Sequence, residues 1–288
     1  YRYQVRAVDA AGNLSGYSSI VSATTLAQGS GIPHTLGWYD IPNTKLRPVC
    51  AAENGFPQVW GVAGCSGITD AWSGGAFDSK RNRLIITGGG HAAYYGNELY
   101  ALNLNTLTIQ RLTDPGLPSA PTSCSSGTPD CIYDSYYNAG CMETVANGTQ
   151  PNSRHTYDGL AYMANADRLF VFSGSLACSL GAFGQYTWTF DFSTMQWQNM
   201  SPSGAIPSVG PGKVTAYDPN TGKVFVNDLS YLYSYDFSTN SYTRYDNSYQ
   251  YGIDYHTTAA IDPKRKKFVI IGAGQAWMID ISSGSTYA

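Results

Sequence analysis

Apolar and polar residues alternate in short segments along most of the chain, and polar turns separate these segments. Four units show the pattern, and they begin SGGAFDSKRNRLIITGGG, YDGLAYMANADRLFVFSGS, KVTAYDPNTGKVFVNDLS and HTTAAIDPKRKKFVIIGAG. Alternation with a period of two is typical of half-buried β-strands. No long segment shows the period of about 3.6 residues that marks an amphipathic helix. The pattern predicts an all-β protein.

Each of the four units has the same order of elements. Two apolar strands flank a polar turn, and a third strand, a turn such as DFSTM or DFSTN, and a fourth strand follow. The equivalent apolar positions are Phe77, Tyr162, Tyr217 and Ile261. Four-stranded units repeated in this way are typical of β-propeller blades. We expect a propeller over residues 36–288, with blades at about 68–113, 154–203, 211–247 and 254–288.

The first two units are separated by an insertion at residues 114–153, which lacks alternating strand pairs. Loops of this length are usually functional or disordered. A closed propeller commonly has about six or seven blades. The four visible units therefore predict part of a seven-bladed ring, with residues 36–49 as an outer strand that closes it, and with polypeptide beyond both ends.

Residues 1–25 alternate around the turn AAGNLSG and predict a hairpin with one apolar face. The segment YRYQVRAVDAAGNLSGYSS resembles the end of a fibronectin type III domain. A whole domain of that type is a sandwich of about 100 residues. The resemblance implies that residues 1–27 are the last strands of a partial fibronectin type III sandwich, and that residues 28–35 form a linker.

Composition narrows the class of partner. Charged residues make up 13% of the 288 residues, and the formal net charge is −3. This balance gives no reason to expect nucleic acid or an anionic membrane as partner. No apolar run reaches the roughly 18 residues that a membrane span needs.

The six cysteines are an even number, and none lies in a CxxC pair. An oxidising compartment is favoured over free thiols in a reducing cytoplasm, which predicts a secreted or cell-surface protein. We expect a local disulfide between Cys124 and Cys131. The remaining pairs would form among Cys50, Cys65, Cys141 and Cys178, and proximity favours Cys50 with Cys65.

Several functional side chains are expected on one face of the propeller. The loop that leaves the second strand of a blade and the loop that enters its first strand lie on the same face. His91 follows a second strand after the glycines GGG, whereas His155, Tyr157 and His256 precede first strands. Trp72 has the same register as Tyr157 and His256. The glycines give the backbone the freedom to turn before His91.

These residue types suit both catalysis and binding. Histidine titrates near neutral pH, and tyrosine is a proton donor or, when its pKa is depressed, a base. Arg154 lies in the same segment, and a guanidinium can clamp a carboxylate with two hydrogen bonds. Each histidine taken alone can equally be a structural residue. The candidate substrate-binding residues are Trp72, Tyr94, Tyr95, His155 and His256.

The segments GGGHAAYYGNELYALNL and NSRHTYDGLAY resemble secreted bacterial kelch-like propellers of the galactose-oxidase type, and more distantly propeller-type ulvan lyases. This resemblance implies a polysaccharide lyase that cleaves uronate-containing glycans by β-elimination. It implies catalytic roles for His91 and Tyr157, and a carboxylate clamp at Arg154. Relatives carry a structural zinc, so a zinc or calcium ion is expected, with ligands that the sequence does not identify.

Three other functions remain open at this point. The chain can be a non-catalytic propeller that binds glycan or protein through rim aromatics. It can assemble with other copies through an open propeller edge. A copper-radical oxidase needs two tyrosines, two histidines and a cysteine beside one tyrosine, and no cysteine falls at that face. The fold alone does not decide among these functions, and the lyase is favoured slightly over the binding module.

Overall fold

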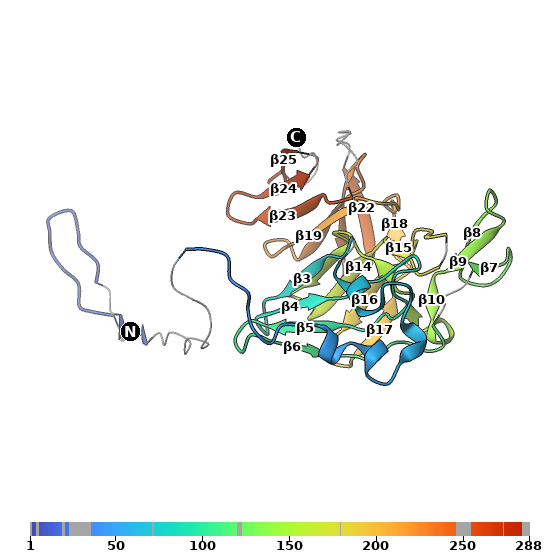
Figure 1. Ribbon diagram of the computed structural model, residues 1–288. Helices are drawn as coiled ribbons and strands as arrows, with labels where there is room; N and C mark the ends of the chain where they lie inside the picture. Colours follow the sequence, from blue (N-terminus) through green and yellow to red (C-terminus); the bar gives the residue numbers. More distant parts are fainter. Residues whose placement is uncertain are drawn as a thin grey trace.

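The computed structural model describes residues 2–3, 6–18, 21–22, 36–70, 72–119, 123–178, 180–245, 255–272 and 274–283. Regular structure in these residues is almost entirely β, and the helices are short 3-10 segments (Figure 1). The prediction of an all-β protein is confirmed.

Four antiparallel sheets form the body of the molecule. The first is β3 (Gly75–Asp78), β4 (Arg83–Ile86), β5 (Tyr100–Asn103) and β6 (Thr108–Arg111). The second is β13 (Leu160–Met163), β14 (Arg168–Phe172), β16 (Thr187–Asp191) and β17 (Gln196–Asn199). In both sheets, strands that are neighbours in this order are paired by hydrogen bonds.

The other two sheets follow the same plan. The third is β19 (Val214–Asp218), β20 (Lys223–Asn227), β21 (Leu232–Asp236) and β22 (Ser241–Tyr245), with β18 (Ser203–Gly204) added parallel to β22. The fourth has β23 (Thr258–Asp262), β24 (Lys267–Gly272) and β25 (Gln275–Asp280). Each sheet has its main strands in one of the four repeated sequence units, and the predicted blade bounds stay predictions.

Aspartate and asparagine side chains define the turns of the blades. The turn after the third strand begins with the same kind of residue in all four sheets, at Asn103, Asp191, Asp236 and Asp280. In each case the side-chain oxygen accepts a hydrogen bond from the backbone N–H two residues later. Such side-chain turns stop a strand and reverse the chain. The repeated turn in the sequence therefore has a local physical cause.

The sheets pack face to face because alternate residues of a strand point to opposite sides. In β14, Leu169 and Val171 lie in the core between the first and second sheets. Phe170 and Phe172 lie in the core between the second and third sheets. All four side chains are buried. Burial of each side chain contributes about 1.5–3 kcal/mol. Because the side chains alternate between the two faces of β14, this strand stabilises the packing on both of its neighbouring sheets.

Residues of the four first strands, β3, β13, β19 and β23, line one cavity of about 560 Å³. Sheets packed face to face around a cavity, with their first strands innermost, form a propeller-like arrangement (Figure 1). The kelch-like class and the seven-bladed ring stay predictions. Met278 and Ile271 lie on the face of the fourth sheet that points away from the third, and their side chains are exposed.

Two segments differ from the sequence-based expectation. Residues 36–49 do not form an outer strand, because Pro42 and Pro48 interrupt the segment and Asn43 adopts a φ of 64°. The insertion at 114–153 contains a small sheet of β7 (Ser123–Cys124), β9 (Ala139–Met142) and β8 (Cys131–Asp134), and a pair of β10 (Thr144–Val145) with β11 (Gln150–Pro151).

The N-terminal hairpin forms between β1 (Arg2–Tyr3) and β2 (Val21–Ser22). A bridge between Val8 and Leu14 lies within it. Its identity as the end of a fibronectin type III sandwich stays a prediction, and the linker at 28–35 lies outside the described residues. Within the described ranges, no helix combines the length and apolar character needed to cross a bilayer.

Three disulfides join the six cysteines. They are Cys50–Cys65, Cys124–Cys131 and Cys141–Cys178. The two predicted pairings are confirmed, and the third follows from the remaining cysteines. Complete pairing of the cysteines is what an oxidising compartment produces.

Candidate functional site

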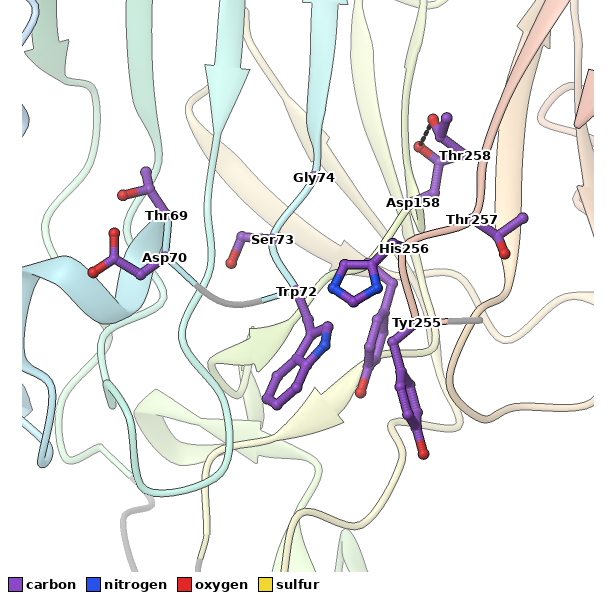
Figure 2. A pocket seen from close by; sticks show the side chains of 11 residues that line it. Thr69, Asp70, Trp72, Ser73, Gly74, Asp158, Tyr255, His256, Thr257 and Thr258 are labelled. Carbon is purple, nitrogen blue, oxygen red and sulfur yellow. Dashed lines mark hydrogen bonds between the residues drawn. The ribbon is translucent and has the colours of Figure 1, made fainter. Parts of the chain in front are cut away.

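The segments that lead into the first strands meet at one face of the blades. Residues 72–74 lead into β3, 157–158 into β13 and 255–257 into β23, and they line a cavity of about 490 Å³ (Figure 2). We call it the aromatic cavity, and its lining residues are Thr69, Asp70, Trp72, Ser73, Gly74, Tyr157, Asp158, Tyr255, His256, Thr257 and Thr258. The predicted convergence of Trp72, Tyr157 and His256 is found.

Three aromatic rings form the wall of this cavity. The ring centroid of Tyr255 lies 6.1 Å from that of Trp72 and 6.2 Å from that of Tyr157. The Trp72 and Tyr255 side chains are 41% and 49% exposed, so a ligand can reach both. Figure 2 shows the Trp72 and Tyr255 rings extending to the same side of the backbone, with the His256 imidazole above them in this view.

His91 and His155 lie behind this wall and do not line the cavity. The His155 ring centroid is 5.1 Å from that of Trp72, 6.4 Å from that of Tyr157 and 5.3 Å from that of His91. His155 is buried and His91 is half-buried. The His155 ring therefore lies between His91 and the rings of Trp72 and Tyr157 in the described contacts.

The backbone at three of these residues is in the left-handed region. The φ angles are 50° at Trp72, 43° at His91 and 47° at Tyr157. Such values are uncommon for bulky residues and cost about 1–3 kcal/mol each. The Tyr157 N–H donates to the Trp72 carbonyl oxygen at 2.7 Å, and the surrounding structure thereby holds both residues in place. Strain of this kind at a cavity points to function.

The glycines before His91 allow a close approach of backbones. A Cβ at Gly90 would lie 2.2 Å from the His155 nitrogen and 2.3 Å from the Ser175 carbonyl oxygen. Gly90 also has a φ of 80°. The His91 N–H donates to the Leu176 carbonyl oxygen at 2.9 Å. The glycine run thus lets His91 lie against residues 175–176, which follow β14 in the second blade.

Burial sets the protonation of the site. It lowers the pKa of His91, so this imidazole is neutral at pH 7. Burial, with the neighbouring Tyr255 hydroxyl, raises the pKa of Tyr157 to about 12, so this hydroxyl is a proton donor and not a base. Burial also raises the pKa of Asp158 to about 7, although its carboxylate accepts hydrogen bonds from the Ala259 N–H and the Thr258 hydroxyl.

The structure gives Arg154 an internal partner in place of a ligand. Its side chain is buried and forms an ion pair of 3.1 Å with the buried Glu143. Its other donors bind the carbonyl oxygens of Asn152 and Ser173. Truncating one partner of such a pair would leave a buried charge, which is strongly destabilising. These internal partners do not favour a carboxylate clamp at Arg154, and that role stays a prediction.

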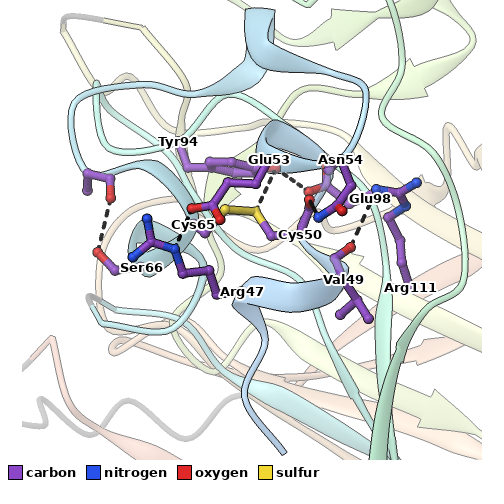
Figure 3. Close-up of a disulfide and its surroundings, with 12 residues drawn as sticks. Arg47, Val49, Cys50, Glu53, Asn54, Cys65, Ser66, Tyr94, Glu98 and Arg111 are labelled. Carbon is purple, nitrogen blue, oxygen red and sulfur yellow. Dashed lines mark hydrogen bonds and ion pairs between the residues drawn. A yellow bond between two sulfur atoms is a disulfide. The ribbon is translucent and has the colours of Figure 1, made fainter.

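Tyr94 and Tyr95 are also away from the aromatic cavity. The Tyr94 ring is buried beside the Cys50–Cys65 disulfide, and its hydroxyl donates to Glu98 (Figure 3). Tyr95 packs on the same core cluster. Tyr94 holds the turn after the first blade's second strand against residues 50–65, because its ring is buried and its hydroxyl has an internal acceptor.

Sequence reasoning missed several lining residues, among them Tyr255 and Asp158. Tyr255 is adjacent to His256, and its position directly before a first strand is the signal that could have found it. Asp158 follows Tyr157 in the same way. No group of three or more His, Cys, Asp or Glu side chains in the described part of the chain could hold a metal ion. The structural zinc or calcium stays a prediction.

Comparison with known proteins gives distant structural similarities, of which two are described here. No protein-family model and no curated protein matches the chain. An auxiliary nutrient binding protein from Bacteroides ovatus ATCC 8483 is similar at a TM-score of 0.39 and 11% identity, over 73% of this chain and 38% of that one. YjhT is similar at a TM-score of 0.46 and 14% identity, over 75% of this chain and 63% of that one. The chain thus spans less than two thirds of either protein, and similarities this distant identify no ligand or reaction for it.

Proposed function

We propose that the aromatic cavity binds a carbohydrate and that the chain is a secreted carbohydrate-active propeller. The observation that carries the proposal is the set of rings of Trp72, Tyr157 and Tyr255 around one open cavity of about 490 Å³. Aromatic faces stack on the apolar C–H faces of sugar rings, and the polar edges of Tyr and Trp bind hydroxyl groups. A cavity with few, well-placed polar groups between aromatic walls is typical of small-ligand sites.

The polar lining favours a neutral sugar in this cavity. Ser73, Thr257 and Asp70 offer hydroxyl and carboxylate groups to sugar hydroxyls. Among the described residues that line the aromatic cavity there is no Lys or Arg. A uronate carboxylate would therefore lack a permanent cation beside it, and Asp70 would repel it. A glycan-binding role is supported better than a uronate-specific one.

Calorimetric titration tests the proposal. Neutral and uronate oligosaccharides are titrated into the wild type, into Trp72→Ala and into Tyr255→Ala. Each substitution should weaken binding about tenfold, which corresponds to about 1.4 kcal/mol. Trp38→Ala is the control, because Trp38 is 103% exposed and lies outside the aromatic cavity. Wild type that binds none of the sugars, or equal affinity in Trp72→Ala and Trp38→Ala, contradicts the proposal.

Polysaccharide lyase activity is the second candidate, and Tyr157 and His256 favour it because both line the cavity. In β-elimination a base removes the C5 proton of a uronate, a C4–C5 double bond forms, and the C4–O bond breaks. The protonated Tyr157 hydroxyl suits the donor to the leaving oxygen. A neutral histidine suits the base, and His256 lines the cavity whereas His91 does not.

Unsaturated product that absorbs at 235 nm separates the two candidates. Tyr157→Phe deletes only a hydroxyl, and it should lower elimination by about 10²–10⁴-fold with little change in stability. His91→Ala should have a comparable effect only if His91 is itself the base. If wild type forms no unsaturated product from any uronate polymer, the lyase candidate falls and the binding proposal stands.

A further inference from the structure

A second cavity of about 440 Å³ adjoins the aromatic cavity. Its lining residues are Lys45, Leu46, Arg47, Glu53, Trp60, Ala63, Cys65, Ser66, Thr69 and Asp70. Thr69 and Asp70 line both cavities, and both are exposed. A ligand that leaves the aromatic cavity over these two short polar side chains enters the second cavity.

The second cavity has its own exposed indole. Trp60 is 41% exposed, the same fraction as Trp72. A Cβ at Gly64 would lie 2.6 Å from the Trp60 ring, so the ring rests directly on the Gly64 backbone. The Gly64 φ of 59° suits glycine at this point. The Trp60 indole is thus a supported, solvent-facing platform.

The segment that carries Trp60 is held rigidly. The Cys50–Cys65 disulfide closes it, and its 3-10 helix η4 (Gly64–Ile68) leads to Thr69 and Asp70. The backbone N–H groups of Thr69 and Asp70 both donate to the Ser66 carbonyl oxygen. These bonds position Thr69 and Asp70 at the end of the segment that carries Trp60. Preorganised aromatic groups bind with little loss of conformational entropy.

The charges of the second cavity differ from those of the aromatic cavity. Arg47 forms an ion pair of 2.6 Å with Glu53 (Figure 3). Lys45 is exposed, and within the described ranges no carboxylate forms an ion pair with it. Lys45 thus adds a positive charge outside any ion pair to the lining of the second cavity, which also holds the Asp70 carboxylate. An acidic substituent on a ligand would be attracted there, and would be kept from the junction by Asp70.

We propose that the second cavity is a distal subsite for the same glycan chain, in which Trp60 stacks a sugar and Lys45 favours an acidic substituent on it. This inference rests on the proposed carbohydrate binding and adds the substrate class: an oligosaccharide or polysaccharide that is long enough to cross Thr69 and Asp70, with a carboxylate on the distal residue. A monosaccharide or disaccharide fills the aromatic cavity alone.

Chain length is the variable that tests the subsite. The probes are the neutral, methyl-esterified α-1,4-linked galacturonate dimer and hexamer, and an acidic hexamer with a free carboxylate on one terminal residue, and calorimetry gives each Kd. In wild type the hexamer should bind at least about tenfold more tightly than the dimer. Trp60→Ala should remove this gain and leave the dimer Kd unchanged. Trp38→Ala is the matched control, as another exposed tryptophan, and should keep the gain.

The charge is tested with a separate variant. Lys45→Gln should weaken binding of the acidic hexamer about two- to fivefold and leave the methyl-esterified hexamer unchanged. Lys264→Gln, an exposed lysine on another blade, is the control. If dimers bind and Trp72→Ala loses them, but hexamers bind no better, the subsite is overturned and the proposed function survives. If neither length binds to the wild type, both the proposed function and the subsite are contradicted.

Discussion

The backbone N–H of Tyr157 donates a hydrogen bond of 2.7 Å to the carbonyl oxygen of Trp72, and both residues have left-handed φ angles, 47° and 50°. This contact joins the start of the second blade to the start of the first. It sets the positions of two of the three rings that line the aromatic cavity. The strain at both residues is therefore coupled to the shape of the site.

Gly74→Ala should disrupt this contact. A Cβ at Gly74 would lie 2.1 Å from the Tyr157 carbonyl oxygen, so the two backbones must separate. We expect a loss of about 1–3 kcal/mol in the free energy of unfolding and weaker glycan binding. Gly16→Ala is the control, because a Cβ there has no neighbour within 4 Å. Equal stability and affinity in the two variants would show that the contact does not shape the site.

Gly181→Ala should displace His91. A Cβ at Gly181 would lie 2.0 Å from the His91 ring, and Gly181 has a φ of 64°. The pKa of His91, which burial lowers, should move toward its ordinary value of 6.5 as the ring becomes exposed. NMR titration of the imidazole measures this. Gly127→Ala imposes a comparable backbone strain, at a φ of 83°, with open space around it, and should leave the His91 pKa unchanged. An unchanged pKa in Gly181→Ala would contradict the packing of His91 described above.

Asp158 should make stability depend on pH in a defined direction. Its pKa is raised from 3.8 to about 7 in the folded protein, so the folded state binds more protons than the unfolded state between these values. Its stabilising contribution is fully present below about pH 3.8 and is lost as the pH rises through 7. Asp158→Asn has no such titration.

Urea unfolding of the wild type and Asp158→Asn at pH 4, 6 and 8 measures this effect. The free energy of unfolding of the wild type minus that of the variant should fall by up to a few kcal/mol from pH 4 to pH 8. Taking the difference cancels the opposite contributions of Asp167 and Asp280, whose pKa values ion pairing and hydrogen bonding lower. A difference that stays flat or rises with pH would mean that burial does not control this carboxyl.

Removal of the Cys50–Cys65 disulfide should weaken glycan binding. The disulfide closes a loop with a sequence separation of 15, which carries Trp60 and leads to Trp72. The chain-entropy model gives a loss of about 3 kcal/mol. The double variant Cys124→Ala/Cys131→Ala opens a loop in the insertion and is the control. Glycan affinity should fall in Cys50→Ala/Cys65→Ala and persist in the control. Unchanged glycan affinity in both double variants would show that the Cys50–Cys65 disulfide does not contribute to the binding site.

Local patterns made the blades predictable from the sequence. The alternation of residues between the two faces of β14 and the aspartate side-chain turns each involve only a few neighbouring residues. Both can therefore be recognised in the amino-acid sequence. The sheet inside 114–153 was not predicted, because its strands are short and Cys124–Cys131 holds its turn. The identity of the wider ring, the N-terminal sandwich and self-association through the open face at Met278 stay predictions.

The site was predictable in its location and less so in its members. Strand order brought Trp72, Tyr157 and His256 to one cavity. Arg154 and Tyr94 look like functional residues in the sequence. In the structure, however, their polar groups bind the buried side chains of Glu143 and Glu98, respectively. Only the packed structure reveals those partners, since burial and not residue type determines whether a polar group is available to a ligand.

A crystal structure of the wild type with a bound hexasaccharide tests the central claim most directly. The account predicts a sugar ring stacked on the exposed Trp72 or Tyr255 ring in the aromatic cavity, with the chain continuing over Thr69 and Asp70 toward Trp60. The oligosaccharide is chosen as the tightest binder from calorimetry. Sugar density elsewhere on the blades, with the cavity between Trp72 and Tyr255 empty, would contradict the account.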